Sequence, residues 1–254
     1  MTLRLFVPGP LQPLAQVALP EAAARHAMVR RVQPGDDLLL FDGSGFDWPA
    51  QVLAVTRSGV SVCVGQPQTV DTEPRVSVTV ALVMPANERM DVLVEKATEL
   101  GVAHIQPLHS VRSVLRLGGA RAERKRAHWQ AIAQAACEQC GRAVVPQVAP
   151  VRDLQDWLQD LAQGRLQPAP APARARWLLS LRPLARSVAA HGWPSQELCT
   201  LSGPEGGFTP DEEAAAHAAG FEPVALGPRV LRAETAPLAV LAWLALSQPI
   251  LGDG

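Results

Sequence analysis

The chain has 254 residues, of which 48% are apolar and 19% charged, and its formal net charge is −1. This composition excludes an intrinsically disordered chain, and the length suffices for one large or two modest domains. A charge so close to zero also excludes a uniformly basic surface, so any surface that binds nucleic acid must be local.

The first 70 residues contain short β-like runs separated by turns. An apolar run at 37–41 ends at Asp42-Gly43-Ser44-Gly45, which is typical of a hairpin turn, and alternating apolar positions follow at 48–55 and 60–64. A helix is expected before them, over residues 20–29. Together these elements predict a small β-barrel over residues 1–70.

After a short linker at 71–74, the pattern changes to strands that alternate with helices. Thr209, Pro210 and Glu212 mark one helix start, as N-cap, first helical residue and third residue of a capping box. Such alternation is typical of a mostly parallel sheet covered by helices, so residues 75–254 are predicted to form an α/β domain. Strands are expected over 76–84, 103–108, 144–148, 177–181 and 197–201, and helices over 88–100, 120–140, 154–161, from 210, and over 235–247.

Two segments near the carboxyl end each combine a strand end, a Gly/Pro turn and a helix start. The first contains Gly203-Pro204-Glu205-Gly206-Gly207, and the second runs from Leu226 to Pro237. Ligands of open α/β sheets bind outside the carboxyl ends of strands, and glycines let the main chain approach a ligand closely. Neither segment matches a Walker loop or a dinucleotide fingerprint. We therefore expect a ligand site of another kind at this edge of the sheet.

Basic residues are concentrated between Val111 and Gly141, where they face only two acidic residues, Glu123 and Glu138. This imbalance indicates a surface for a polyanion, although a solvated helix face is the alternative. The residues expected to contact phosphates, there and elsewhere in the chain, are Arg25, Arg30, Arg31, Arg89, Arg112, Arg116 and Arg142.

Neither a metal nor a membrane is expected. The only closely spaced cysteine pair is Cys137 and Cys140, whereas a structural zinc site needs four ligands, so we expect inert thiols. The longest apolar run, from Pro237 to Leu246, is too short to span a bilayer. A cytoplasmic location is therefore the expectation.

Five blocks of sequence occur in an order that resembles the RsmE family of 16S rRNA (uracil-N3)-methyltransferases, members of the SPOUT class. They lie at 40–43, 95–102, 136–142, 203–207 and 226–235. The resemblance implies a PUA-like β-barrel over 1–70, which binds RNA, and a SPOUT α/β domain over 75–254 that contains a deep trefoil knot. It further implies S-adenosyl-L-methionine as cofactor, 16S rRNA of the small ribosomal subunit as partner, a homodimer, and no DNA partner.

By match to the family, three loops would hold the cofactor, at 178–181, 201–207 and 226–236. The cofactor-binding residues implied in this way are Leu179, Ser180, Leu181, Leu201, Gly203, Pro204, Glu205, Gly206, Gly207, Leu226, Gly227, Val230, Leu231, Arg232, Thr235 and Ala236.

Methylation at N3 of uracil requires loss of the N3 proton or stabilisation of negative charge on the ring. Arg232, or else Arg229, is a candidate to neutralise charge on a uracil carbonyl oxygen, and Arg232 ranks first for catalysis. Glu205 ranks second, and Glu234 is the other candidate to accept the proton. Because N3 is engaged in a base pair, the uridine must be unpaired or flipped out.

Two other functions remain open from the sequence. A related knotted enzyme could methylate another RNA position, such as a ribose 2′-hydroxyl. A non-catalytic RNA-binding protein of ribosome assembly would use the barrel and the arginines, but it has no use for glycine-rich cofactor loops.

Overall fold

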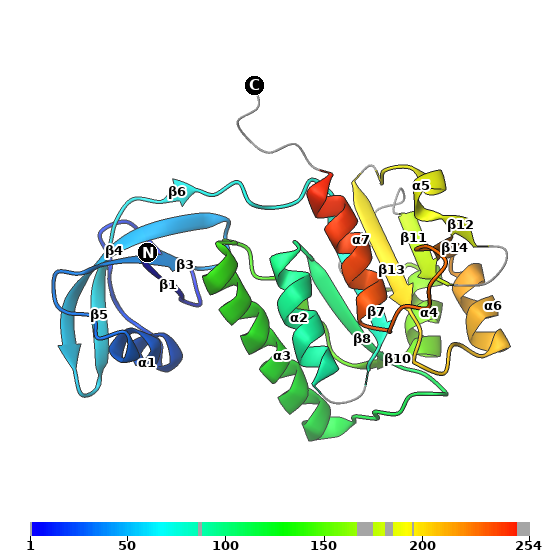
Figure 1. The fold of residues 1–254 in the computed structure, drawn as a ribbon. Helices are drawn as coiled ribbons and strands as arrows, with labels where there is room; N and C mark the ends of the chain where they lie inside the picture. Colours follow the sequence, from blue (N-terminus) through cyan, green and yellow to red (C-terminus); the bar gives the residue numbers. More distant parts are fainter. Residues whose placement is uncertain (1, 86–87, 167–174, 181–184, 195, 248–254) are drawn as a thin grey trace. The chain divides into compact units, whose positions relative to one another are not determined.

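The computed structural model describes residues 2–85, 88–166, 175–180, 185–194 and 196–247 (Figure 1). The chain divides into two compact units. The first unit comprises Met1–Glu73 and Gln134–Val145, and the second comprises Pro74–Ala133 and Pro146–Gly254.

The first unit is built on a six-stranded sheet of order β1-β3-β4-β5-β2, in which β6 also pairs with β4. Strands β1 and β3 are parallel, and the other neighbours are antiparallel. The predicted helix at 20–29 and the predicted hairpin turn at 42–45 are confirmed. The elements are β1 (Leu3–Phe6), β2 (Gln16–Ala18), α1 (Glu21–Val29), β3 (Asp37–Phe41), β4 (Phe46–Thr56), β5 (Gly59–Val64) and β6 (Gln68–Thr69).

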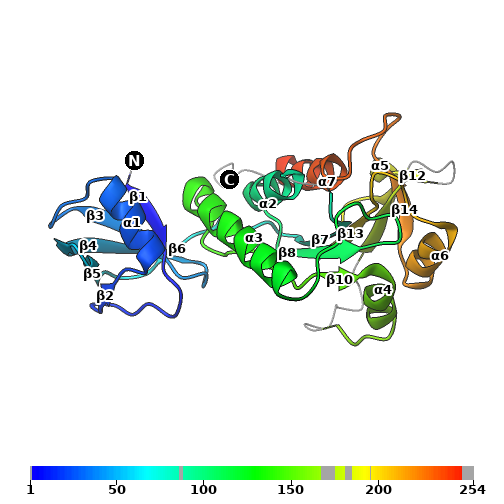
Figure 2. The same ribbon diagram turned by 90° about the horizontal axis from the view of Figure 1, so that it is seen from below.

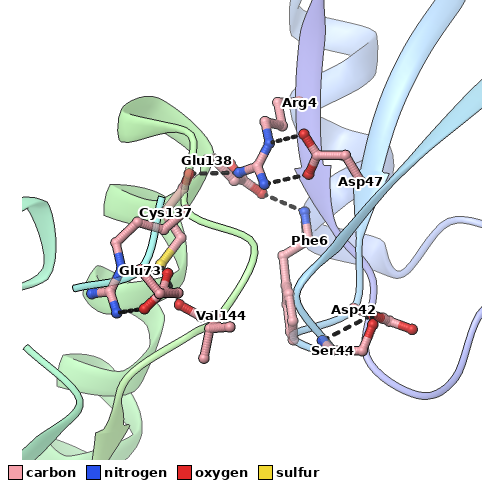
Figure 3. Close-up of polar contacts among 10 residues, drawn as sticks. Arg4, Phe6, Asp42, Ser44, Asp47, Glu73, Cys137, Glu138 and Val144 are labelled. Atoms are coloured by element: carbon pink, nitrogen blue, oxygen red, sulfur yellow. Dashed lines mark hydrogen bonds and ion pairs between the residues drawn. The ribbon is translucent and has the colours of Figure 1, made fainter. Parts of the chain in front are cut away.

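The segment 134–145 belongs to the first unit, where the buried Arg4 of β1 forms a hydrogen bond to it (Figure 3). Arg4 Nη2 donates to Asp47 Oδ1 at 2.6 Å, and its Nη1 donates to the carbonyl oxygen of Cys137 at 2.7 Å. Glu138 Oε1 accepts the backbone N–H of Phe6 at 3.0 Å. These hydrogen bonds to charged groups join residues that are more than a hundred positions apart in the sequence.

The second unit contains an eight-stranded sheet of order β10-β8-β7-β13-β11-β14-β12, with β9 also paired to β8. All of these pairs are parallel, as the alternating pattern predicts. The strands are β7 (Ser77–Val83), β8 (His104–His109), β9 (Gln147–Val148), β10 (Arg152–Asp153), β11 (Ala175–Leu179), β12 (Arg186–Ser187), β13 (Glu197–Ser202) and β14 (Glu222–Ala225).

Helices cover both faces of this sheet (Figure 2). Helix α2 packs against α7 on one face, and α4 packs against α6 on the other. Trp157 of α4 and Phe221, which follows α6, are buried in the core of that second face, with ring centroids 6.1 Å apart. The helices are α2 (Arg89–Glu99), α3 (Gly119–Cys140), α4 (Leu154–Ala162), α5 (Val188–His191), α6 (Pro210–Ala218) and α7 (Thr235–Leu246).

The predicted start of α6 is confirmed in detail. Thr209 Oγ1 accepts the backbone N–H of Glu212 at 3.2 Å, and Glu212 Oε2 accepts that of Thr209 at 2.8 Å, with Pro210 as the first helical residue. The strand expected at 144–148 is wrong in extent, because only Gln147–Val148 is a strand. Pro146 has no N–H to donate to a sheet, which accounts for the shortening. None of the helices in the described part of the chain has the length and apolarity to cross a membrane.

Candidate active site

A cavity of about 660 Å³ lies at the carboxyl ends of β13, β11 and β14, which are neighbours in the sheet. Its volume is in the range typical of small-molecule sites. The residues after these strands form its walls, together with Arg112 from the loop after β8 and Glu213 from α6. The cavity therefore lies at the edge where the sequence predicts a ligand site.

Most of the cofactor-binding residues expected from the sequence lie in the wall of this cavity. Leu201 does not, because it is fully buried within β13, and Gly227 and Thr235 are not part of the wall either. Leu181 lies outside the described residues. The expected residues that do line the cavity are Leu179, Ser180, Gly203, Pro204, Glu205, Gly206, Gly207, Leu226, Val230, Leu231, Arg232 and Ala236.

Other wall residues are absent from that expected set. Four of them, Leu178, Ser202, Arg229 and Ala233, lie within the loop ranges that the family match implies for the cofactor site. Arg112 is different, since no local pattern connects it with a segment more than ninety positions away. The additional wall residues are Arg112, Leu178, Ser202, Phe208, Glu213, Val224, Arg229 and Ala233.

The three glycines around Glu205 have different local environments. A Cβ on Gly203 would lie 3.0 Å from Cε2 of Phe208, and Gly207 has a left-handed φ of +67°. Gly207 therefore needs glycine for its backbone conformation, whereas a side chain at position 203 would fit only if the ring of Phe208 shifted. A Cβ on Gly206 would meet only the side chain of Arg112, at an ordinary 3.6 Å. Gly206 is thus the glycine whose identity the loop alone does not explain.

Three hydrogen bonds join the loop after β8 to the glycine-rich loop, to the residue that follows it and to the first turn of α6. Arg112, expected to contact RNA, donates from Nη1 to the carbonyl oxygens of Gly206 and Phe208. The backbone N–H of Val111 donates to Glu212 Oε1 at 2.9 Å. Both carboxylate oxygens of the buried Glu212 are therefore hydrogen-bonded. Oε2 accepts in the capping box, and Oε1 accepts from the loop after β8.

The three catalytic candidates occupy different positions. Arg232 is exposed and lines the cavity. Glu205 also lines it, and its Oε1 lies 3.2 Å from Nη1 of Arg89. Glu234 does not line it, but its Oε1 lies 3.9 Å from Nε of the same arginine. The other carboxylate oxygen of Glu234 is buried and has no hydrogen-bond partner among the described residues.

The basic residues expected to bind RNA also differ in their surroundings. Arg30 and Arg31 are exposed, and Arg25 is exposed beside Glu21, 2.5 Å away. Arg116 is exposed but donates to the carbonyl oxygens of Ser110 and Val111 at 3.2 and 3.1 Å.

The structure contradicts the prediction for Arg142. This side chain is 3% exposed, and its Nε donates to Glu73 Oε1 at 3.0 Å. A buried guanidinium that is already paired with a carboxylate is not available to a phosphate.

The two closely spaced cysteines are not part of a metal site among the described residues. Cys137 and Cys140 are free, and burial raises the pKa of the Cys137 thiol to about 12. Such a thiol is inert at neutral pH. Over the ranges that the structure describes, no group of three or more His, Cys, Asp or Glu side chains is arranged to hold a metal ion.

Two family descriptions match the chain. Residues 72–245 match the family described as "RNA methyltransferase domain", and residues 19–62 match "RNA methyltransferase PUA domain". Among curated proteins, the chain is 30% identical to ribosomal RNA small subunit methyltransferase E of Bacillus subtilis over 228 residues, 89% of this chain and 88% of the relative.

Two solved structures are similar over nearly their whole length. One is a ribosomal RNA small subunit methyltransferase E from Neisseria gonorrhoeae bound to S-adenosyl methionine, with 34% identity and a TM-score of 0.87, over 96% of this chain and 97% of that one. The other is a putative methyltransferase from Legionella pneumophila in complex with the same cofactor, with 29% identity and a TM-score of 0.88, over 97% and 98% of the two chains.

Proposed function

This chain belongs to the ribosomal RNA small subunit methyltransferase E family, and we propose that it uses S-adenosyl-L-methionine to methylate N3 of a specific uridine in 16S rRNA. The observation that carries the proposal is the cavity at the ends of β13, β11 and β14, in a chain that matches a cofactor-bound structure over almost its whole length.

The residues of the cavity fit this cofactor. Ser202 Oγ, in the wall, is buried and without a hydrogen-bond partner in the described structure, so it can serve a polar ligand group. Gly206 leaves space for a ligand to approach the main chain, since only Arg112 lies near its missing Cβ. Leu179, Val230 and Leu231 add apolar wall. When bound, the cofactor supplies an activated methyl group on a sulfonium.

We assign the catalytic role to Arg232. It is an exposed arginine in the wall of the cavity, so its guanidinium can reach a base placed at the mouth and offset negative charge that develops on a uracil carbonyl oxygen. Glu205, in the cavity wall, and Glu234, whose second carboxylate oxygen has no partner within the described part of the chain, are the proposed acceptors of the N3 proton. The target uridine must be unpaired or flipped out, because pairing occupies N3.

Residues 1–70 are proposed as a PUA-like β-barrel that binds rRNA, and residues 75–254 as the SPOUT methyltransferase domain. The match of 19–62 to a PUA domain of RNA methyltransferases and the exposed Arg25, Arg30 and Arg31 support the first assignment. Arg116 is the proposed phosphate contact in the second.

Three further features are proposed from membership of the family. The carboxyl-terminal chain would thread through a deep trefoil knot. The protein would act as a homodimer. It would work in the cytoplasm, because the names of its relatives refer to the small ribosomal subunit, which is found there.

The experiment that tests the function combines cofactor binding with mapping of the product. Calorimetry with S-adenosyl-L-methionine should show one binding event. Nucleoside mapping of 16S rRNA from a strain that lacks this gene should show loss of 3-methyluridine at one position, restored by the purified protein. Loss of a 2′-O-methyl group instead would indicate the other methyltransferase activity, and absence of binding heat would indicate a non-catalytic RNA-binding protein.

A further inference from the structure

We propose that Arg89 is a positioning residue of the active site, which holds the two cofactor loops together by pairing with both Glu205 and Glu234. This inference rests on the proposed function. It replaces the expectation that Arg89 contacts an rRNA phosphate.

The geometry places one guanidinium against two loops that are far apart in sequence. Nη1 of Arg89 lies 3.2 Å from Glu205 Oε1, in the turn after β13, and Nε lies 3.9 Å from Glu234 Oε1, just before α7. Segments on both sides of these glutamates line the cavity. The arginine therefore spans the two loops that the cofactor is proposed to contact.

The backbone that carries Arg89 is firmly held. The next residue, Met90, and Leu93 in the following turn are fully buried. Asp91 accepts hydrogen bonds from Trp129 Nε1 at 3.0 Å and from His128 Nε2 at 2.9 Å, which attach the first turn of α2 to α3. Because the first turn of α2 is held by these contacts, the guanidinium of Arg89 can determine the positions of the two glutamates.

The charges explain why both loops depend on this residue. The carboxylates of Glu205 and Glu234 both lie beside Arg89 and repel one another, and the positive guanidinium offsets this repulsion. The fork of an arginine can serve two acceptors at once, whereas a lysine ammonium is a single point charge on a flexible stem. The pairing uses Oε1 of Glu234 and leaves its buried Oε2 without a partner in the described residues, so Arg89 also sets where that acceptor lies.

The same charges argue against a phosphate contact. An arginine flanked by two carboxylates presents a net negative group to the solvent, and phosphate binding depends on net positive charge. The side chain is also only 41% exposed, between its two partners.

The test compares Arg89→Ala and Arg89→Lys with a matched control, Arg126→Ala. Arg126 is also a half-exposed arginine paired with a glutamate, Glu123 at 2.9 Å, but neither residue lines the cavity. For each folded variant of the full chain, the affinity for S-adenosyl-L-methionine is measured by calorimetry, the affinity for a 16S rRNA fragment by filter binding, and the melting temperature by calorimetric scanning.

We expect Arg89→Ala to weaken cofactor binding by about fivefold, near the upper end for an ion pair that is partly exposed. Arg89→Lys should recover part of this loss, and Arg126→Ala should leave cofactor affinity unchanged. A double-mutant cycle of Arg89→Ala with Glu205→Gln should give less than the product of the single effects, because removal of either partner already breaks the pair.

Wild-type cofactor affinity in Arg89→Ala, combined with weaker RNA binding, would overturn the inference and restore the phosphate contact. An equal loss in the alanine and lysine variants with a lowered melting temperature would also overturn it, in favour of a general structural role. Failure of the proposed function is distinguishable, because the wild-type protein would then bind no cofactor at all.

Discussion

Arg112 donates a hydrogen bond from Nη1 to the carbonyl oxygen of Gly206 at 2.9 Å, and the same nitrogen lies 3.3 Å from the carbonyl oxygen of Phe208. A residue after β8 is thereby bonded to the loop after β13, at the wall of the cavity. A hydrogen bond from a charged donor is stronger than one between neutral groups, although partial exposure reduces its contribution.

We therefore predict that Arg112→Ala weakens S-adenosyl-L-methionine binding by about fivefold, which corresponds to about 1 kcal/mol for a partly exposed charged contact. Arg112→Lys should recover only part of this affinity, because an ammonium cannot copy the geometry of the guanidinium. Arg121→Ala, which changes an exposed arginine outside the cavity wall, is the control. Calorimetric titration of the three variants checks the prediction, and equal affinities for Arg112→Ala and Arg121→Ala would contradict it.

The glycine-rich loop offers a second test, in which neighbouring glycines serve as controls for one another. Gly206→Val should fold normally, because its φ is not left-handed and its Cβ meets Arg112 at an ordinary distance. It should weaken cofactor binding by about tenfold to a hundredfold, since the added atoms occupy space next to the ligand. Gly203→Val should instead lower stability by about 1–3 kcal/mol, because its Cβ would lie 3.0 Å from the ring of Phe208.

Urea unfolding and cofactor titration of both variants separate the two effects. If Gly206→Val binds the cofactor as tightly as the wild type, the proposed approach of the ligand to this main chain is incorrect. A Gly203→Val protein of undiminished stability would show that the ring of Phe208 can move aside.

The parts of this structure that local sequence determines could be predicted, and the parts that depend on distant contacts could not. Thr209 and Glu212 form a capping box within four residues, so the start of α6 follows from the sequence. Arg112 and Arg89 reach partners 94 and 116 positions away, and nothing in their neighbourhood distinguishes them from surface arginines. Their charge was visible in the sequence, but the carboxylates and carbonyls that surround them were not.

The same reason explains the errors in individual elements and roles. Arg142 was expected on a polyanion surface because it follows a basic region, yet Glu73 and burial remove it from contact with phosphate. The strand expected to end before Leu226 is present as β14, but its bounds could not be predicted, because Glu222–Ala225 is short and its pairing with β11 decides its structure. The carboxyl edge of the sheet could nevertheless be located, because its loops carry their own glycine and proline signals.

His109 makes the stability of the second unit dependent on pH. Burial lowers its pKa below the ordinary 6.5, and the nearby Arg116 lowers it further, while Asp153 opposes this effect. The neutral ring accepts the backbone N–H of Leu117 at Nε2, 3.2 Å away. Because the folded pKa lies below the unfolded one, the contribution to stability is complete above about pH 6.5 and is lost as the pH falls through the folded pKa.

We expect the free energy of unfolding to decrease between pH 7 and pH 5 in the wild type, and to decrease less in His109→Gln, whose amide oxygen can still accept from Leu117. Urea unfolding monitored by tryptophan fluorescence at a series of pH values measures this. Identical pH slopes in the two proteins would show that other groups determine the acid sensitivity.

Arg232 provides the most direct test of the chemistry. It lies in the cavity wall between Leu231 and Ala233, which also line the cavity, and its side chain is exposed. If it stabilises negative charge on the uracil during methyl transfer, its effect belongs to the transition state and appears in kcat. We predict that Arg232→Ala slows methylation by about two orders of magnitude or more, the effect of losing one positioned electrostatic donor. Arg232→Lys should regain part of the rate, because the charge remains but the planar fork is lost.

The measurement is single-turnover methylation of small ribosomal subunits, with the affinities for S-adenosyl-L-methionine and for rRNA determined in parallel. Arg229→Ala is the comparison, because Arg229 is the alternative candidate for this role and also lines the cavity, only three residues away. A slow Arg232→Ala with nearly normal affinities and a faster Arg229→Ala would establish the assignment. A near-normal rate in Arg232→Ala would remove this residue from the mechanism and leave Glu205 as the next candidate, because its carboxylate lies in the same cavity wall.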